Sequence, residues 1–139
     1  MNTLVDTSVW SLALRRKARD LSPAEEAAVA ELGELIREGR ARVIGWVRQE
    51  LLSGIKTQAQ YEKLRAVLRS FGDEPVDTSD YEAAAKASNE CRARGVAVSV
   101  SDILICAIAV SRGWSIFTTY PDFKNYARVL GIKLHAPRK

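Results

Sequence analysis

Hydrophobic residues recur along the chain in two alternating patterns: short apolar runs, and longer stretches with apolar residues three and four positions apart. The short runs are typical of buried strands and predict strands at 1–5, 42–45, 75–76, 115–117 and 132–134. The longer stretches predict amphipathic helices between the strands. Many of these helices are followed by a glycine, which readily ends a helix, at Gly39, Gly54, Gly72, Gly95 and Gly113. The pattern therefore predicts alternating strands and helices along the whole chain.

Residues that favour helix starts mark where the predicted helices begin. Ser22 and Glu25 form a capping box with Pro23 at the first helical position. Capping residues also stand at the predicted starts of other helices, at Asp6, Thr57, Ser79 and Ser99. No hairpin dipeptide such as Asn-Gly joins neighbouring strands, so parallel pairing through helical crossovers is favoured. We expect an α/β fold, a three-layer α/β/α sandwich with a mainly parallel sheet.

The length and composition indicate one folded domain. With 139 residues, 47% hydrophobic and 27% charged, the chain is long enough to bury a core and too short for two. No apolar run reaches the roughly 20 residues that a membrane-spanning helix needs, and the first residues lack the layout of a secretion signal. We therefore expect a cytoplasmic protein without membrane contact, in which residues 1–139 form a single domain.

Cysteine and histidine offer little for catalysis or metal binding. Cys91 and Cys106 form no paired motif and are expected to be small core residues. His135 is the only histidine and lies in the basic tail 133–139, so no Ser–His or Cys–His pair is indicated. The net charge of +4 permits a polyanionic partner without requiring one.

Four acidic residues stand where a parallel sheet would bring them together. Asp6 follows the first predicted strand, and Asp122 follows the strand at 115–117. Asp102 lies in the first turn of a helix, and Glu50 follows the second strand by a helical turn. Ligands bind beyond the carboxyl ends of strands in parallel α/β sheets. If these carboxylates converge there, charges about 4 Å apart repel by roughly 4 kcal/mol, so a hard cation such as Mg²⁺ or Mn²⁺ is needed.

Each of these acids also has a simpler explanation, and spacing alone leaves both open. Asp6 and Asp102 stand where an acid can cap a helix or interact with its dipole. Asp122 is equally an ordinary first-turn acid, and Glu50 could be a solvent-facing helix residue. Helix capping and surface exposure would then account for all four.

Basic and aromatic side chains also allow two interpretations. Arg15 and Arg16, with Lys17 and Arg19, could steer a phosphate backbone toward the first acid, or simply form a solvated helix face. The three tryptophans could stack on bases. Because they stand close to predicted strands and helix starts, we expect them in the core instead.

Four short motifs, in a fixed order along the chain, carry a resemblance to a known family. They are Leu4-Val5-Asp6-Thr7-Ser8-Val9-Trp10, Arg48-Gln49-Glu50-Leu51-Leu52-Ser53-Gly54, Ser101-Asp102-Ile103-Leu104-Ile105 and Phe117-Thr118-Thr119-Tyr120-Pro121-Asp122-Phe123. Together they resemble the PIN-domain ribonuclease family, in particular the VapC-type toxins of bacterial toxin–antitoxin pairs. The resemblance spans essentially the entire chain.

The resemblance implies a PIN-like nuclease domain that hydrolyses RNA internally with a metal-activated water. The implied ligands of one or two Mg²⁺ or Mn²⁺ ions are Asp6, Glu50, Asp102 and Asp122. Residues that could contact a ligand or a phosphate are Thr7, Ser8, Thr118, Arg15 and Arg16. In the family the last motif often reads Thr-x-Asp-x-Asp-Phe, whereas Tyr120 stands here in place of the first acid.

The resemblance also implies partners. An antitoxin would cover the active-site groove with one of its segments, and a second copy of the chain would complete a homodimer. RNA is the implied substrate, and we expect His135 at the surface or in contact with that RNA.

Three other functions are alternatives to this one. One is a PIN nuclease outside toxin biology, in RNA processing or on single-stranded DNA, which the absence of a small antitoxin frame beside the gene would favour. A second is phosphoryl transfer through an aspartyl intermediate with Asp6 as nucleophile. The common form of that mechanism has an Asp-x-Asp motif at the first strand, but Ser8 occupies the second acid position here. The last is a non-catalytic binding module with the same fold. A test of metal binding would distinguish this module from a metal-dependent nuclease.

Overall fold

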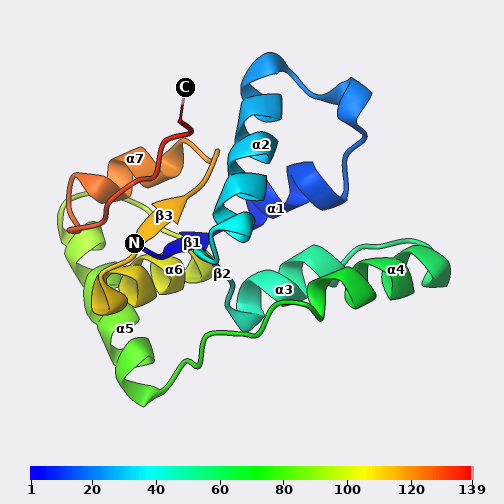
Figure 1. Cartoon of the computed structure of the whole chain (residues 1–139). Helices are drawn as coiled ribbons and strands as arrows, with labels where there is room; N and C mark the ends of the chain where they lie inside the picture. Colours follow the sequence, from blue (N-terminus) through cyan, green and yellow to red (C-terminus); the bar gives the residue numbers. More distant parts are fainter. Residues whose placement is uncertain (139) are drawn as a thin grey trace.

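A computed structural model describes residues 1–138 of the chain (Figure 1). Within them a three-stranded sheet has the strand order β2-β1-β3. The strands are β1 (Thr3–Val5), β2 (Ala41–Arg42) and β3 (Ser115–Phe117). The helices are α1 (Thr7–Leu14), α2 (Pro23–Arg37), α3 (Gly45–Leu52), α4 (Gln58–Leu68), α5 (Thr78–Ala93), α6 (Val100–Arg112) and α7 (Asp122–Ala127), with a 3₁₀ turn, η1, at Ala18–Asp20.

The central strand β1 pairs in parallel with both of its neighbours. Leu4 is paired with Arg42 on one side and with Ile116 on the other, and Val5 is paired with Phe117. Every residue of β1 is buried, which is typical of a parallel sheet covered by helices. Figure 1 shows α1 and α2 on one side of the sheet and α5 and α6 on the other. The predicted α/β/α fold is confirmed.

In the described part of the chain, four of the five predicted strands are shorter than expected or absent, and β1 begins at Thr3 rather than at residue 1. Val43 forms only an isolated bridge with Asp73, because α3 begins two residues later. The predicted strand at 75–76 is wrong: the carbonyl of Pro75 accepts a hydrogen bond of 2.7 Å from the Arg112 side chain instead of from a neighbouring strand. Leu134 forms a single bridge with Ile116. The sheet is therefore small, and helices make up most of the fold.

The predicted helix starts are largely confirmed. In α2 the side chains of Ser22 and Glu25 each accept a hydrogen bond from the other's backbone N–H, the predicted capping box. Helices α4 and α6 also begin at their predicted caps. Helix α5 begins earlier than expected, because Asp77 caps it rather than Ser79. Local capping thus fixed most helix boundaries.

The buried hydrophobic residues form one core around α6. Every residue of α6 from 103 to 109 is buried, because this helix packs against α5 and against strands β1 and β3. Cys91 and Cys106 are buried free thiols, as predicted, and burial raises the pKa of both. Neither thiol is therefore activated as a nucleophile. No helix within residues 1–138 is long and apolar enough to cross a membrane.

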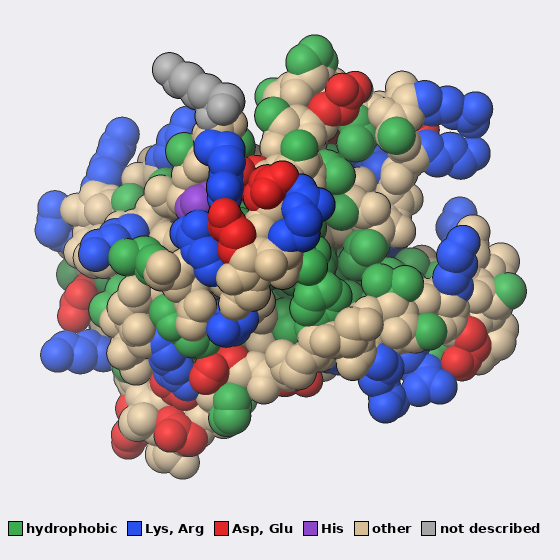
Figure 2. All heavy atoms as spheres, in the orientation of Figure 1, with side chains coloured by type: hydrophobic (Ala, Val, Ile, Leu, Met, Phe, Trp, Pro, Cys, Tyr) green, Lys and Arg blue, Asp and Glu red, His purple; other side chains and the backbone are tan. Residues whose placement is uncertain are grey.

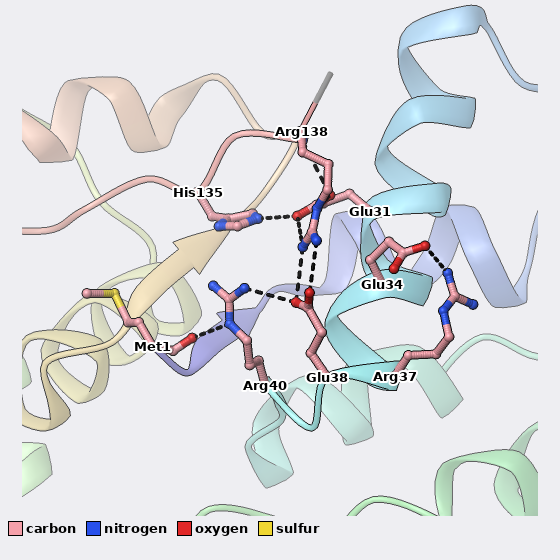
Figure 3. A network of polar contacts seen from close by, with 8 residues as sticks. All are labelled: Met1, Glu31, Glu34, Arg37, Glu38, Arg40, His135 and Arg138. Atoms are coloured by element: carbon pink, nitrogen blue, oxygen red, sulfur yellow. Dashed lines mark hydrogen bonds and ion pairs between the residues drawn. The ribbon is translucent and has the colours of Figure 1, made fainter.

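A buried carboxylate fastens the C-terminal segment to α2 (Figure 3). The Glu31 side chain is 2% exposed, and its Oε2 lies 2.6 Å from Nε2 of His135. Its Oε1 accepts a hydrogen bond of 2.8 Å from Nε of Arg138. His135 is therefore not freely exposed: 15% of its side chain is accessible, because this contact holds the ring against α2. The tail is likewise anchored through residue 138, and Lys139 lies outside the described residues.

Substituting Arg138 by alanine should destabilise the fold, because the buried Glu31 carboxylate loses its main cationic partner. We expect the free energy of unfolding in urea at pH 7 to fall by about 1–3 kcal/mol. Arg37→Ala is the matched control, since Arg37 pairs with Glu34 on the exposed surface of the same helix. The control should cost less than about 0.5 kcal/mol. We call the contacts of Glu31 with His135 and Arg138 the Glu31 clamp. Equal losses of unfolding free energy in the two variants would contradict a stabilising role for this clamp.

The clamp should also make the stability of the protein sensitive to acid. The hydrogen bond from Arg138 lowers the pKa of Glu31 from 4.5 to about 2, so the folded protein binds fewer protons than the unfolded chain. The contribution of Glu31 is therefore complete above pH 4.5 and is lost as the pH falls toward 2. Denaturation at several pH values should show the difference between wild type and Arg138→Ala shrinking over this range. A constant difference would mean that another group is responsible.

Candidate active site

Asp6 stands at the carboxyl end of β1 and caps α1. It is 5% exposed, and its Oδ1 accepts hydrogen bonds from the backbone N of Ser8 at 3.0 Å and from Ser8 Oγ at 2.6 Å. Its Oδ2 accepts a third hydrogen bond, of 2.7 Å, from Oγ1 of Thr118. Burial raises the pKa of Asp6, while these hydrogen bonds oppose the rise. The residue therefore caps its helix and also lies at the strand edge where ligands bind.

Thr118 and Ser8 fasten the loop after β3 to this carboxylate. The Thr118 hydroxyl donates to Asp6 and accepts a hydrogen bond of 2.9 Å from the backbone N of Tyr120. The Ser8 hydroxyl likewise accepts from the backbone N of Thr119, at 3.0 Å. The structure therefore places two of the predicted hydroxyl residues directly at Asp6.

Glu50 joins the same cluster through the neighbouring hydroxyl. It lies on α3, half-buried, and its Oε1 accepts a hydrogen bond of 2.7 Å from Oγ1 of Thr7. Thr7 directly follows Asp6, and α1 packs against α3. The packing of these helices therefore brings the motif around Glu50 to the end of β1.

Asp102 lies in the first turn of α6 and is held by a tyrosine. Its backbone N donates to the Ser99 cap at 3.1 Å, and its Oδ2 accepts a hydrogen bond of 2.8 Å from the hydroxyl of Tyr126. Tyr126 is 2% exposed, and burial raises its pKa, with the hydrogen bond to Asp102 adding to the effect. Tyr126 is therefore a protonated donor at neutral pH. Its sequence context gives no direct sign of this contact, although Tyr126 lies one helical turn after Asp122 on α7.

Asp122 begins α7 next to Tyr120, which replaces an acid of the resembled motif. A hydrogen bond with the Asp122 carboxylate, together with the negative charge of that group, raises the pKa of Tyr120. The charge of Asp102 acts on Tyr120 in the same direction. Tyr120 is 49% exposed, so its ring is accessible from outside. Asp102 and Asp122 thus share a neighbourhood that contains two phenols.

The four acids form two adjoining groups rather than one closed cage. Asp6 and Glu50 lie at the end of β1, and Asp102 and Asp122 lie at the starts of α6 and α7. The loop 118–122 connects the groups, since it bonds to Asp6 at one end and carries Asp122 at the other. Within residues 1–138, no three acidic, histidine or cysteine side chains lie close enough to hold a metal ion. Convergence of three or more of these carboxylates on one ion is therefore not seen in the part of the chain that the structure describes.

The charge of these carboxylates is not neutralised. Among the described residues, Asp6, Glu50, Asp102 and Asp122 form no ion pair with Lys, Arg or His. The buried Asp80, in contrast, is paired with Arg112. Carboxylate oxygens that have no ion-pair partner are groups that hard divalent cations bind. The donor chemistry thus fits Mg²⁺ or Mn²⁺.

A separate groove of about 680 Å³ carries the basic residues near α1. Figure 2 shows Lys and Arg side chains on both sides of a hollow between the α1–α2 connection and α4. Arg15 and Arg16 line this groove at the C-terminal end of α1, a helix that spans about 12 Å. They therefore lie away from Asp6 and Thr7 at the other end of the helix. The remaining lining residues are Ala13, Leu14, Lys17, Gly54, Ile55, Lys56, Gln60, Lys63, Leu64 and Val67.

The fold is similar to several solved structures of low sequence identity. FitAcB from Neisseria gonorrhoeae matches with a TM-score of 0.76 and 21% identity over 97% of each chain. VapBC2 from Rickettsia felis, bound to a DNA fragment from its promoter, matches with 0.74 and 16% over 97% of this chain and 98% of that one. VapBC-5 from Mycobacterium tuberculosis, a member of the VapBC family of toxin–antitoxin systems, matches with 0.68 and 19% over 96% of each.

No curated protein sequence matches the chain. The sequence model of the PIN domain, in contrast, matches residues 3–129, a span that contains all four acids and the whole sheet. The match extends over most of the chain, and the solved structures show the same fold. The chain therefore belongs to the PIN domain family.

Proposed function

We propose that this PIN-domain protein is a metal-dependent endoribonuclease that acts as the toxin of a toxin–antitoxin pair. PIN domains are a family of nucleases, and the observation that carries the proposal is the set of four unpaired carboxylates around the end of β1 and the starts of α6 and α7. A structural role alone would favour ion-paired acids, such as Glu31 and Asp80. Acids without cationic partners are suited to binding a cation.

In this proposal the ligands of one or two Mg²⁺ or Mn²⁺ ions are Asp6, Glu50, Asp102 and Asp122. When bound, the ion would stabilise the charge that develops on the phosphodiester and lower the pKa of the attacking water. The Ser8 and Thr118 hydroxyls orient the Asp6 carboxylate, and Thr7 orients that of Glu50. His135 is engaged by Glu31, which argues against a histidine-dependent reaction.

Two further partners follow from this proposal. An antitoxin is supported by the similar fold of VapBC-5, which belongs to a toxin–antitoxin family. The groove beside α1 is lined by both apolar and basic residues, which complement an acidic amphipathic segment of such a partner. We further propose that the chain forms a homodimer and acts in the cytoplasm. A PIN nuclease of RNA processing, or one acting on single-stranded DNA, is the alternative.

Replacing Asp6 by asparagine should abolish RNA cleavage. Cleavage of a mixed RNA pool by the purified wild type should require Mg²⁺ or Mn²⁺ and stop with EDTA, and Asp6→Asn should lower the rate by about 100-fold or more. The control Asp20→Asn alters an exposed acid in η1 and should cleave like the wild type. Activity of the folded wild type in EDTA, or equal rates in wild type and Asp6→Asn, would contradict a metal-dependent site.

For RNA cleavage, the hydrogen bond that Thr118 donates to Asp6 should be more important than the volume of the Thr118 side chain. Thr118→Val keeps the shape and removes the hydroxyl, and we expect cleavage to fall by about 10-fold. Thr119→Val is the matched control, because among residues 1–138 the hydrogen bond of this exposed neighbour to the site comes from its backbone N–H. The two rates, measured at equal metal concentration, should differ by this factor. Similar rates would show that Asp6 does not need this donor.

The basic groove should contribute to antitoxin binding. Lys63→Glu reverses a charge that lines the groove and should weaken inhibition by a cognate antitoxin by about 10-fold in affinity. Lys86→Glu on α5 is exposed outside this groove and serves as the control. The readout is the antitoxin concentration that halves RNA cleavage. An unchanged value for Lys63→Glu would place the antitoxin elsewhere.

A further inference from the structure

The hydroxyl of Tyr126 is a buried polar group in contact with a candidate ligand. Tyr126 lies on α7 and is 2% exposed. Its hydroxyl donates a hydrogen bond of 2.8 Å to Oδ2 of Asp102, which belongs to α6 and lies 24 positions earlier in the chain. The contact therefore joins two helices at the edge of the site.

Packing alone does not account for this tyrosine. Its ring packs edge to face on Phe123 with centroids 5.1 Å apart, and a phenylalanine ring could make the same contact. A hydroxyl in a buried position is costly unless it finds a hydrogen-bond partner. The partner here is the unpaired Asp102 carboxylate, so the hydroxyl of Tyr126 is tied to the site rather than to the core.

The hydrogen bond leaves one oxygen of Asp102 available. Among residues 1–138, Oδ1 of Asp102 accepts no hydrogen bond, whereas Oδ2 is held by Tyr126. Asp6 differs, because both of its oxygens already accept hydrogen bonds. With Oδ2 fixed, the carboxylate of Asp102 presents Oδ1 in a defined direction. This is the arrangement by which a neighbouring donor orients a metal ligand.

We propose that Tyr126 is a positioning residue that orients Asp102 for binding a divalent cation. The inference rests on the metal-dependent function proposed above. Tyr126 acts through Asp102 and needs no contact with the ion or with RNA. Its loss should therefore weaken metal binding and raise the metal concentration needed for cleavage, while the KM for RNA stays unchanged.

Tyr126→Phe tests this with Mn²⁺ as the probe. Calorimetry on the full-length chain should show Mn²⁺ binding about 10-fold weaker than in the wild type. Cleavage should recover as Mn²⁺ is raised, because the ligand itself is still present. Tyr81→Phe is the control: it also removes one phenol hydroxyl, from a side chain on α5 that is 56% exposed, and should bind Mn²⁺ like the wild type.

A double variant separates positioning from a loss of stability. If Tyr126 acts through Asp102, adding Tyr126→Phe to Asp102→Asn should produce no further loss of Mn²⁺ affinity. Additive losses, or wild-type affinity in Tyr126→Phe, would overturn the inference while leaving the proposed metal site intact. A wild type that binds no Mn²⁺, or Asp102→Asn with unchanged affinity, would overturn the proposed function and this inference together. Thermal denaturation of each variant confirms that it is folded.

Discussion

The parallel pairing of β1 with β3 brings together two chain segments more than 100 residues apart, and the site depends on it. Thr3 and Ser115 meet through their side-chain oxygens at 2.8 Å, 112 positions apart, and the backbone N of Asp6 donates to the carbonyl of Phe117 at 3.0 Å. Both strands therefore end at the same edge of the sheet. Asp6 and Thr118, the next residues of the two strands, are adjacent as a direct consequence.

Two buried acids, Glu31 and Asp6, differ in the charge of the groups that contact them. Glu31, 2% exposed, is surrounded by His135 and Arg138, and the hydrogen bond from Arg138 lowers its pKa. Asp6, 5% exposed, has only neutral donors, and burial raises its pKa. The first arrangement stabilises the fold, whereas the second keeps an uncompensated charge at a cost in stability. Such a cost is typical of residues kept for binding or catalysis.

Much of the fold could be predicted because its signals are local. The apolar runs of β1 and β3 and the caps at Ser22 and Ser99 each lie within a few residues of the feature they specify. The clamp at Glu31 could not be predicted, since its partners lie more than 100 positions away and appeared to be a plain basic tail. Tyr126 was missed for a similar reason: only the packing of α7 beside α6 shows that its hydroxyl meets Asp102.

The side-chain donors that contact the four candidate ligands are uncharged hydroxyls, so they leave the negative charge of the carboxylates in place. Ser8 and Thr118 hold Asp6, Thr7 holds Glu50, and the two phenols contact the remaining acids. A guanidinium in any of these places would orient a carboxylate equally well but would cancel its charge. Because a hydroxyl orients the oxygen and leaves the charge in place, the cluster retains the negative potential that attracts a divalent cation. Tyr120, which stands where the family often has an acid, therefore lowers the negative charge of the site, and its phenol lies near Asp122.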